Sequence, residues 1–295
     1  MIVKEAFDNF MLYKSASGLS ENSLDAYRWQ CLPLLRYFEN WELESIRQED
    51  IYRFLQSVQS ASYSQSTKSS YIRSARIFLK WCSCEYEVNY RYDKIKVPKM
   101  PKKEIKMYSR EDILLIFDTV QGTPEWVRLR NIALVALFLD SGIRRAEACY
   151  LRREDVDFAE HRIIVTGKGN KQRYAPFGDF TAECLNAYLA ECPYESELFF
   201  AGIHGGVWSL NAVSQMFHDL QNRLPFKLSP HKCRHNFATN HCLDNYEDEK
   251  PVDPLLLQAL MGHEDIKTTR RYLHQANELI AVKKHISHLD KVKAG

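Results

Sequence analysis

The chain has 295 residues, of which 45% are hydrophobic, and a formal net charge of +2 at pH 7. A chain of this length can form two domains with separate hydrophobic cores. Its longest apolar run, residues 132–139, is much shorter than the roughly 20 residues that a transmembrane helix requires, and residues 1–15 carry acidic side chains but no separate apolar signal region. This pattern argues against a membrane-spanning helix, and we expect a folded protein that stays in the cytoplasm.

The eight cysteines are spread along the chain without the spacing of a disulfide framework. We expect reduced thiols, because disulfides rarely persist in the cytoplasm. Cys82 and Cys84 are separated by a single residue, which is too close for a usual zinc site. We therefore predict no metal site and no other cofactor.

The first ninety residues predict four helices separated by polar breaks. Apolar residues recur at helical spacing over residues 3–14, and Ser20 is placed to cap a second helix that extends to Phe38. A third apolar stripe covers residues 51–58, and a fourth begins near Gln65. The start of the chain is therefore expected to be entirely helical.

The fourth helix carries basic side chains away from its apolar face. They are Lys68, Arg73, Arg76 and Lys80. Residues 1–63 contain six Lys and Arg against nine Asp and Glu, whereas residues 64–106 contain eleven against four. A locally basic surface on a nearly neutral chain is typical of a protein that binds a polyanion, nucleic acid above all. A solvated, lysine-rich linker is the alternative interpretation.

A domain boundary is expected at residues 97–106, VPKMPKKEIK. Proline interrupts helices, and the clustered lysines resist burial. We therefore predict a helical domain over residues 1–98, a basic linker over residues 99–107 and a second domain over residues 108–295.

The second domain begins with a capping box, in which Ser109 and Asp112 flank the start of an apolar helix. A longer apolar helix over residues 126–140 is expected to end at Gly142, because glycine readily adopts the conformation that terminates a helix.

The hydrophobic period then changes. Residues 162–166 and 172–177 predict two strands joined by the turn GKGNK, and helical patterns dominate again from residue 181. The predicted fold class is mainly α with a small β-sheet.

Four short polar motifs follow one another: SGIRRAE at 141–147, TGKGNKQR at 166–173, HKCRH at 231–235 and GHEDIKTTRRY at 262–272. Neither a Walker phosphate loop nor an H-E-x-x-H zinc motif is present. Together the motifs supply two arginines, a lysine, two histidines and a tyrosine, without a carboxylate cluster for magnesium. Fixed cations can stabilise the charge of a phosphodiester in transfer without a metal. The motifs therefore predict a site that cleaves DNA or RNA.

The order R…K…H-x-x-R…G-H…Y resembles that of the tyrosine site-specific recombinases, the phage-integrase family, and is closest to Xer-type and transposon integrases. The matching residues are Arg144 with Glu147, Lys168 in the hairpin turn, His231 with Arg234, His263, and Tyr272 nine residues later. The resemblance covers nearly the whole chain, although its specific motifs lie in the second domain. It implies an N-terminal four-helix, SAM-like core-binding domain and an α+β catalytic domain.

The resemblance implies an enzyme that recombines DNA at specific sites by metal-free strand cleavage and rejoining. Tyr272 is the expected nucleophile, which forms a 3′-phosphotyrosyl intermediate, and His231 is expected to take its proton. Lys168 is suited to protonate the leaving 5′-oxygen. The intermediate retains the bond energy, so neither ATP nor a cofactor is needed.

Arg144 and Arg234 suit the non-bridging phosphate oxygens, because a guanidinium group can bind two oxygens at once. His263 adds a donor, and Glu147 lies one helical turn beyond Arg144, where it can orient a cation. The residues predicted to bind backbone phosphates are Lys171, Arg173 and the four basic residues of the fourth helix.

The expected partners are double-stranded DNA with an inverted-repeat core site and further copies of the chain. Four copies are expected to join two DNA sites in a bacterial, phage or mobile-element context. Two alternatives stay open, namely relaxation of supercoils in the manner of type IB topoisomerases and DNA binding without catalysis. Base readout depends on a few side chains in the grooves, so the sequence does not predict the target site.

Two further segments lie near the end of the chain, and the first departs from the family pattern. The segment of residues 244–254 is longer and more acidic than the corresponding segment that we expect in Xer-type relatives, and we predict a loop there. Residues 277–290 carry apolar side chains at helical spacing and predict a terminal amphipathic helix. This helix either folds onto its own domain or docks on a neighbouring subunit.

Overall fold

The computed structural model describes residues 1–99, 106–167, 171–247, 252–283 and 285. By its internal contacts the chain divides into two compact units, Met1–Glu104 and Ile105–Gly295. Each unit contains its own hydrophobic cluster. Most of the linker predicted at 99–107 lies outside the described residues.

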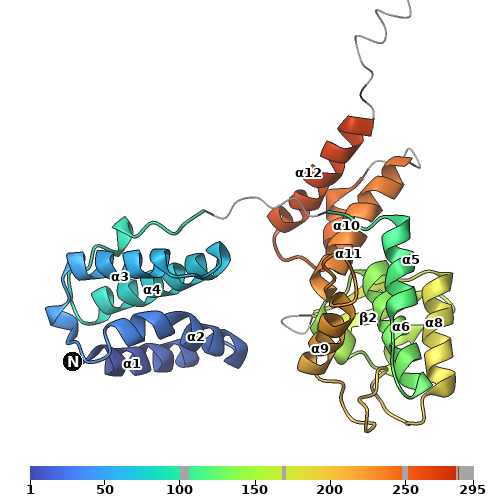
Figure 1. The fold of residues 1–295 in the computed structure, drawn as a ribbon, viewed down its shortest axis with the longest axis horizontal. Helices are drawn as coiled ribbons and strands as arrows, with labels where there is room; N and C mark the ends of the chain where they lie inside the picture. The colour runs from blue at the N-terminus through green and yellow to red at the C-terminus, as the bar shows by residue number, and fades with distance from the viewer. Residues whose placement is uncertain (100–105, 168–170, 248–251, 284, 286–295) are drawn as a thin grey trace, which may run out of the picture. The chain divides into compact units, whose positions relative to one another are not determined.

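The described part of the first unit is built from four α-helices (Figure 1). They are α1 (Val3–Ala16), α2 (Glu21–Tyr37), α3 (Gln48–Ser60) and α4 (Gln65–Glu85), with two short 3₁₀ helices, η1 (Leu43–Ser45) and η2 (Tyr92–Lys94). The Ser64 hydroxyl accepts a hydrogen bond from the Thr67 N–H at 3.1 Å, which satisfies an unpaired donor in the first turn of α4. The predicted four-helix domain is confirmed.

Aromatic side chains fill the core between these helices. Phe10 and Phe78 meet edge to face with ring centroids 5.4 Å apart, and Phe7 and Trp81 each contact this pair. Such pairs add about 0.5–1.5 kcal/mol to the stabilisation that comes from burial alone. Phe78 is fully buried, so it is a central contact between α4 and α1.

The second unit is mostly helical. Its described helices are α5 (Arg110–Thr119), α6 (Glu125–Ser141), α7 (Arg145–Cys149), η3 (Arg153–Asp155), α8 (Asp179–Glu191), α9 (Leu210–Gln221), α10 (Pro230–Glu247), α11 (Pro254–Met261) and α12 (Ile266–Lys283). Its strands are β1 (Val156–Asp157), β2 (Arg162–Thr166) and β3 (Gln172–Pro176). The predicted fold class, mainly α with a small sheet, is confirmed.

The strands form an antiparallel sheet in the order β1-β2-β3. Strands β2 and β3 pair as far as Thr166 and Gln172, beyond which the Gly167 N–H donates to the Lys171 carbonyl at 2.8 Å. The predicted hairpin is therefore present, while its tip, residues 168–170, lies outside the described part. The sequence does not predict β1, because two residues are too few to show an alternating pattern.

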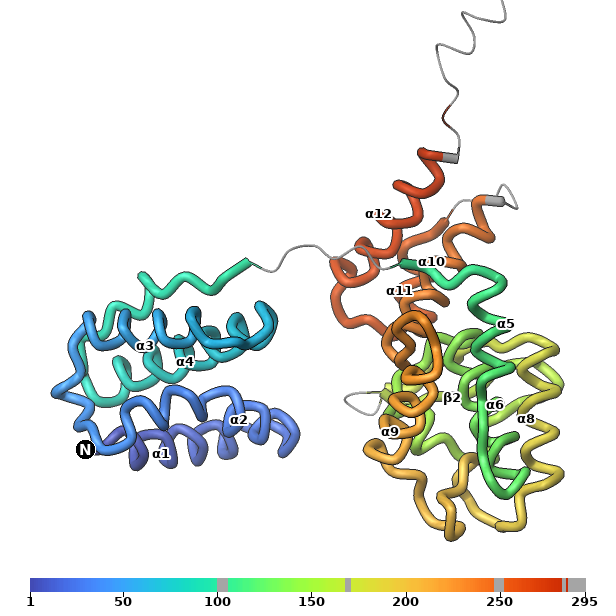
Figure 2. The backbone as a smooth tube through the Cα atoms, viewed as in Figure 1, coloured from blue at the N-terminus to red at the C-terminus, as the bar shows by residue number. Residues whose placement is uncertain are grey.

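Helix α6 is central to the second unit, where it packs against α8 and α10 (Figure 2). It ends at Gly142, whose φ of +61° is left-handed, as the sequence predicted. The capping box of α5 also forms, because Ser109 Oγ accepts from the Asp112 N–H at 3.1 Å and Asp112 accepts from the Ser109 N–H at 3.0 Å. Neither α6 nor any other helix in the described ranges is long and apolar enough to cross a membrane.

Two predicted boundaries near the end of the chain are corrected. Residues 244–247 of the segment expected as a loop belong to α10, because acidic residues can continue a helix, and residues 248–251 lie outside the described part. The segment expected as a separate helix from residue 277 is continuous with α12, which also holds Tyr272. Residues 286–290 of that segment lie outside the described part.

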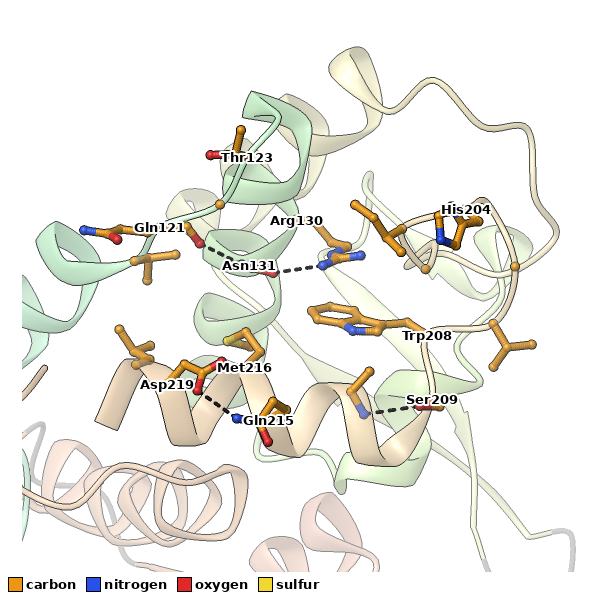
Figure 3. A pocket seen from close by; sticks show the side chains of 18 of the residues that line it. Gln121, Thr123, Arg130, Asn131, His204, Trp208, Ser209, Gln215, Met216 and Asp219 are labelled. Atoms are coloured by element: carbon orange, nitrogen blue, oxygen red, sulfur yellow. Dashed lines mark hydrogen bonds between the residues drawn. The ribbon is translucent and has the colours of Figure 1, made fainter. Parts of the chain in front are cut away.

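A cavity of about 690 Å³ lies between α6, α9 and residues 201–208 (Figure 3). Arg130 lines it and is buried without a carboxylate partner in the described part of the chain. Its guanidinium carbon lies 3.7 Å from the centroid of the Trp208 ring, and its Nη1 donates to the Ala201 carbonyl at 2.7 Å. Burial lowers the pKa of Arg130 to about 10. We interpret Arg130 as a structural residue whose contacts hold residues 201–208 against α6.

Replacing Phe78 by Ala should lower the free energy of unfolding of the first unit by about 3–5 kcal/mol, because the lost ring leaves a cavity in the aromatic core. Urea denaturation followed by circular dichroism measures this change. Trp29 is largely exposed on α2 and provides the control, since Trp29→Ala should change the free energy by less than about 0.5 kcal/mol. Equal losses in the two variants would contradict this description of the core.

Candidate active site

A second cavity, of about 1660 Å³, lies within the second unit among the β2–β3 hairpin and helices α7, α9, α10, α11 and α12. The predicted catalytic side chains that line it are Arg144, His231, Arg234, His263 and Tyr272. Lys168 lies outside the described residues, although Gly167 and the exposed Lys171, on either side of its turn, line the cavity. The four sequence motifs therefore meet at one place.

Arg144 is positioned by the tight end of α6. Gly142 is left-handed there, and a Cβ atom at this position would overlap the Phe237 ring. The backbone N–H of Arg144 donates to the Glu147 carboxylate at 2.7 Å, so that Arg144 is the N-cap of α7. The glycine turn thus fixes where the Arg144 side chain enters the site.

A buried carboxylate links two arginines beside the cavity. The Glu147 side chain is 3% exposed and accepts hydrogen bonds from Arg144 Nη1 at 2.9 Å and from Arg173 Nη1 and Nη2 at 2.8 and 2.9 Å. Burial raises the pKa of Glu147, but the hydrogen bonds from Arg173 and Arg144 outweigh burial and lower the pKa to about 2. The ionised Glu147 therefore holds α7 against β3.

Arg173 lies in a different environment from the one predicted. We expected it to bind a backbone phosphate, but its guanidinium pairs with Glu147, and its Nε donates to the Leu260 carbonyl at 2.9 Å. Its side chain is only 12% exposed. These contacts join the hairpin to the end of α11, which leads into His263, and Arg173 also lines the cavity.

The two predicted catalytic arginines differ in exposure. The Arg144 side chain is 42% exposed, although its Nη2 donates to the Gly262 carbonyl at 2.5 Å. Arg234 is buried and donates from Nη1 and Nη2 to the carbonyls of Gly142 and Met261. Burial, and then the charge of Arg144, lower the pKa of Arg234 to about 10, so it remains a cation at neutral pH. Each guanidinium has five N–H groups and retains some that can contact an oxyanion.

Two histidines on consecutive turns of α10 contact each other beside the cavity. Nε2 of His231 and Nε2 of His235 lie 2.8 Å apart. Burial, and then the charges of Arg234 and Arg271, lower the pKa of His231, so its imidazole is neutral at pH 7. Sequence reasoning did not select His235, although its spacing of four residues from His231 places both on one helix face.

His263 and Tyr272 lie with their rings nearly parallel, at an angle of 5° and with centroids 5.8 Å apart. Nδ1 of His263 contacts the Thr269 hydroxyl at 2.9 Å, which leaves Nε2 to meet a ligand. Burial, and then the arginines of the site, lower the pKa of His263 to about 4. His263 is therefore neutral at pH 7 and can act through hydrogen bonds.

Tyr272 is 3% exposed and lies on α12. Burial raises the pKa of its phenol, while Arg234, Arg271 and Arg144 act in the opposite direction and only partly offset burial. The phenol is therefore protonated at neutral pH. Sequence reasoning did not select Arg271, which also lines the cavity, since its one signal is that it immediately precedes the tyrosine.

The DNA-binding residues predicted in the first unit lie on α4. Arg73, Arg76 and Lys80 are exposed, and spacings of three and four residues place them on one face of the helix. Lys68 instead donates from Nζ to the Gln59 carbonyl at 2.5 Å. Three of the four cations therefore form a stripe that is accessible within this unit.

The cavity of the second unit presents fixed cations and a buried phenol to any group that binds there. Arg144 and Arg234 can contact the oxygens on which a phosphodiester carries its charge during transfer. Within the described ranges, no group of three or more His, Cys, Asp or Glu side chains is arranged to hold a metal ion. This arrangement suits an attack by Tyr272 on a bound phosphate.

In a comparison with known proteins, each of the two units matches a family model. The model of the phage integrase family matches residues 106–278, more than half of the chain, and the model of the phage integrase N-terminal SAM-like domain matches residues 7–85. The chain belongs to the phage integrase family. The resemblance drawn from the motif order is thereby confirmed, and so is the predicted enzyme class, DNA strand breakage and rejoining.

Proteins similar to this phage integrase family member include two that are named tyrosine recombinase XerC. The protein from Anoxybacillus flavithermus (strain DSM 21510 / WK1) is 28% identical over 270 residues, which cover 86% of this chain and 87% of that protein. The protein from Staphylococcus aureus (strain JH9) is 26% identical over 285 residues, which cover 94% of this chain and 93% of that protein. The similarity therefore extends over both units.

Solved structures share the fold. The Tn1549 transposon integrase in complex with circular intermediate DNA has a TM-score of 0.74 and 17% identity, with coverage of 100% of this chain and 98% of that one. The XerH site-specific recombinase bound to palindromic difH substrate has a TM-score of 0.71 and 22% identity, with coverage of 92% and 81%. At these identities the likeness establishes the fold alone.

Glu147→Gln should destabilise the second unit by about 3–5 kcal/mol at pH 7, because Arg144 and Arg173 lose the buried charge that compensates them. The pKa of Glu147 is lowered in the folded state, so its contribution is complete above the ordinary value of 4.5 and is lost as the pH falls toward about 2. The difference between wild type and variant in urea denaturation should therefore shrink over this range. A difference that stays constant would contradict the stabilising ion pair.

Proposed function

We propose that this chain recombines DNA at specific sites through a covalent 3′-phosphotyrosyl intermediate on Tyr272. The observation that supports this most strongly is the meeting of Arg144, Arg234, His263 and Tyr272 around one cavity. Membership of the phage integrase family supports DNA as the substrate. The similar integrase and recombinase that are bound to DNA support a double-stranded partner.

In this proposal the scissile phosphate binds between the two arginines. Arg144, the more exposed of the two, contacts the non-bridging oxygens from the open side, and Arg234 contacts them from the buried side. Nδ1 of His263 contacts the Thr269 hydroxyl; in the proposed tautomer this hydroxyl donates to Nδ1, and Nε2 of His263 donates to the same phosphate. Each such donor contributes roughly 3 kcal/mol to stabilising the transition state.

Tyr272 then attacks the phosphorus, and the proton of its hydroxyl passes to His231. The bond from the phenol oxygen to phosphorus forms as the bond from phosphorus to the 5′-oxygen breaks, so no external energy source is required. Lys168 supplies the proton that the leaving 5′-oxygen takes up. Attack by the 5′-hydroxyl of a second strand reverses these steps and completes the rejoining.

We further propose that four copies of the chain assemble on two DNA sites, each with an inverted-repeat core. Leu279 and Val282 support this assembly, because they are exposed apolar side chains near the end of α12, where a neighbouring subunit can cover them. Arg73, Arg76 and Lys80 of the first unit contact backbone phosphates. The similar XerC proteins come from bacteria, and we propose accordingly that the reaction takes place in a bacterial cytoplasm, on chromosomal, phage or mobile-element DNA.

The nucleophile can be tested by trapping. Wild-type chain mixed with nicked fragments of genomic DNA should form an adduct that survives denaturing electrophoresis, and sequencing the trapped DNA identifies the site. Tyr272→Phe should bind the recovered DNA but form no adduct, because the phenyl ring lacks the attacking oxygen. Tyr174→Phe, on the exposed side of β3, is the matched control and should form the adduct normally.

An adduct formed by Tyr272→Phe would reject this nucleophile. If the wild-type chain instead relaxes supercoiled plasmid without joining two copies of the recovered site, the activity is that of a topoisomerase rather than a recombinase.

Lys168→Ala should slow cleavage by about 10²–10⁴-fold, because the 5′-oxygen must then leave without a positioned acid. DNA with a 5′-sulfur at the scissile bond should restore the rate, since a thiolate leaves readily without a proton. Single-turnover cleavage of both substrates measures the effect. Lys171→Ala serves as the control, and a rescue by sulfur that occurs in Lys171→Ala rather than in Lys168→Ala would assign the acid to Lys171.

A further inference from the structure

His235 is a buried, titratable side chain that the steps above do not use. Its Nε2 lies 2.8 Å from Nε2 of His231, and its ring packs against Tyr272 with centroids 5.0 Å apart at an angle of 49°. It therefore touches both the proposed base and the proposed nucleophile. It is buried and also lines the cavity, although the steps proposed above assign it no contact with the substrate.

The contact between the two histidines restricts what His231 can do. One of the two facing nitrogens must carry the hydrogen that lies between them, because two bare lone pairs would repel each other. With Nε2 committed to His235, only Nδ1 of His231 is left to face the cavity. If the shared hydrogen belonged to His235, then Nδ1 of neutral His231 would carry a proton and could not accept another.

We propose that His235 is a positioning residue that accepts the Nε2–H of His231 and thereby keeps Nδ1 of His231 unprotonated, ready to take the proton of Tyr272. This inference rests on the proposed function, in which Tyr272 attacks a phosphate. The proton moves from the Tyr272 hydroxyl to Nδ1 of His231 as the phenol oxygen bonds to phosphorus. The resulting imidazolium then donates a charge-assisted hydrogen bond from Nε2 to His235.

The surroundings favour a neutral acceptor at this position. The groups that face His235 are His231 and Arg234 from α10, Arg271 and Tyr272 from α12, and His263 from the segment between α11 and α12. A carboxylate here would pair with the arginines and cancel charge that the phosphate needs. Burial, and then His231 and the arginines, lower the pKa of His235 to about 4, so its imidazole stays neutral and can accept a hydrogen bond at pH 7.

Nδ1 of His235 supports a role of this residue in the reaction rather than in the stability of the fold. In the proposed tautomer Nδ1 of His235 carries its proton, and this atom is buried without a hydrogen-bond partner among the described residues. Unsatisfied buried polar groups are rare in proteins and destabilise the fold. An apolar side chain of similar size would avoid this cost, so the ring nitrogens point to a task that packing alone does not require.

Two substitutions of His235 distinguish its role as a hydrogen-bond acceptor from its role in packing. His235→Phe keeps a ring but removes both nitrogens, whereas His235→Gln offers an amide oxygen that can accept the Nε2–H of His231. His241→Phe, a half-buried histidine further along α10 that does not line the cavity, is the matched control. The measurement is the single-turnover rate of adduct formation on pre-bound DNA from about pH 5 to 9, the range in which histidine titrates.

We expect His235→Phe to react about 10–100-fold more slowly than wild type, as is typical when a group that orients another is lost. The acid limb of its pH profile should shift to lower pH, because the protonated form of His231 loses the acceptor that stabilises it. His235→Gln should recover most of the rate and the wild-type limb, and His241→Phe should leave the profile unchanged. If His235 served in packing alone, its replacement would lower the rate without shifting the acid limb of the pH profile.

Equal loss in His235→Phe and His235→Gln with an unmoved acid limb would overturn the proposal, and so would a wild-type rate in His235→Phe. Absence of an adduct with the wild-type chain would instead reject the proposed function. Nitrogen-15 NMR of the wild-type protein, which needs no variant to fold, gives a second test. It should show His231 protonated at Nε2 at neutral pH, and a proton at Nδ1 would contradict the assignment.

Discussion

The candidate site depends on one buried carboxylate. The Glu147 side chain is almost fully buried, and the guanidinium groups of Arg144 and Arg173 pair with its charge. Separating these groups would leave an unpaired charge in the interior, which is strongly unfavourable. Because Arg173 also donates to the Leu260 carbonyl and Arg144 to the Gly262 carbonyl, the same cluster joins α7, the β2–β3 hairpin and the end of α11. Three separate motifs are thereby held in one arrangement.

This arrangement brings the positive charges of several arginines close together, and a bound phosphate would reduce the repulsion between them. Arg144 lowers the pKa of Arg234, and both arginines together with Arg271 act on the phenol of Tyr272. Burial nevertheless keeps the phenol protonated in the protein alone. In the proposed reaction a phosphate in the cavity compensates the cations, and the cations then stabilise negative charge as it passes from the phenol through the phosphate to the leaving oxygen. In this proposal the same arginine charges bind the phosphate and stabilise the transition state.

Much of the fold was predictable because its signals are local. The capping box of Ser109 and the left-handed Gly142 lie within a few residues of the helix ends that they set. The catalytic candidates were predictable from the order and spacing of the motifs, which brought Arg144 and Tyr272 to one cavity as expected. The extension of α10 to Glu247 was missed, because polar composition alone does not distinguish a loop from an exposed helical turn.

The parts that sequence could not predict depend on tertiary contacts. Arg173 was predicted to bind a backbone phosphate, and its pairing with Glu147, 26 residues earlier, is apparent only in the folded chain. His235 was visible in HKCRH, but its importance depends on which nitrogen meets His231 and on the Tyr272 ring that covers it. Neither fact is encoded by residue spacing alone, since each arises where separate elements pack.

In the proposed reaction Arg144 acts on the scissile phosphate by compensating its charge. A methylphosphonate at that position, in which an uncharged methyl group replaces one oxygen, tests this most directly. Removing a donor of this kind typically slows the reaction about 10²–10³-fold. Arg144→Ala should show such a loss on ordinary DNA and regain most of the rate on the methylphosphonate, where less charge needs compensation. Equal loss on the two substrates, or full activity of Arg144→Ala on ordinary DNA, would contradict this role for Arg144.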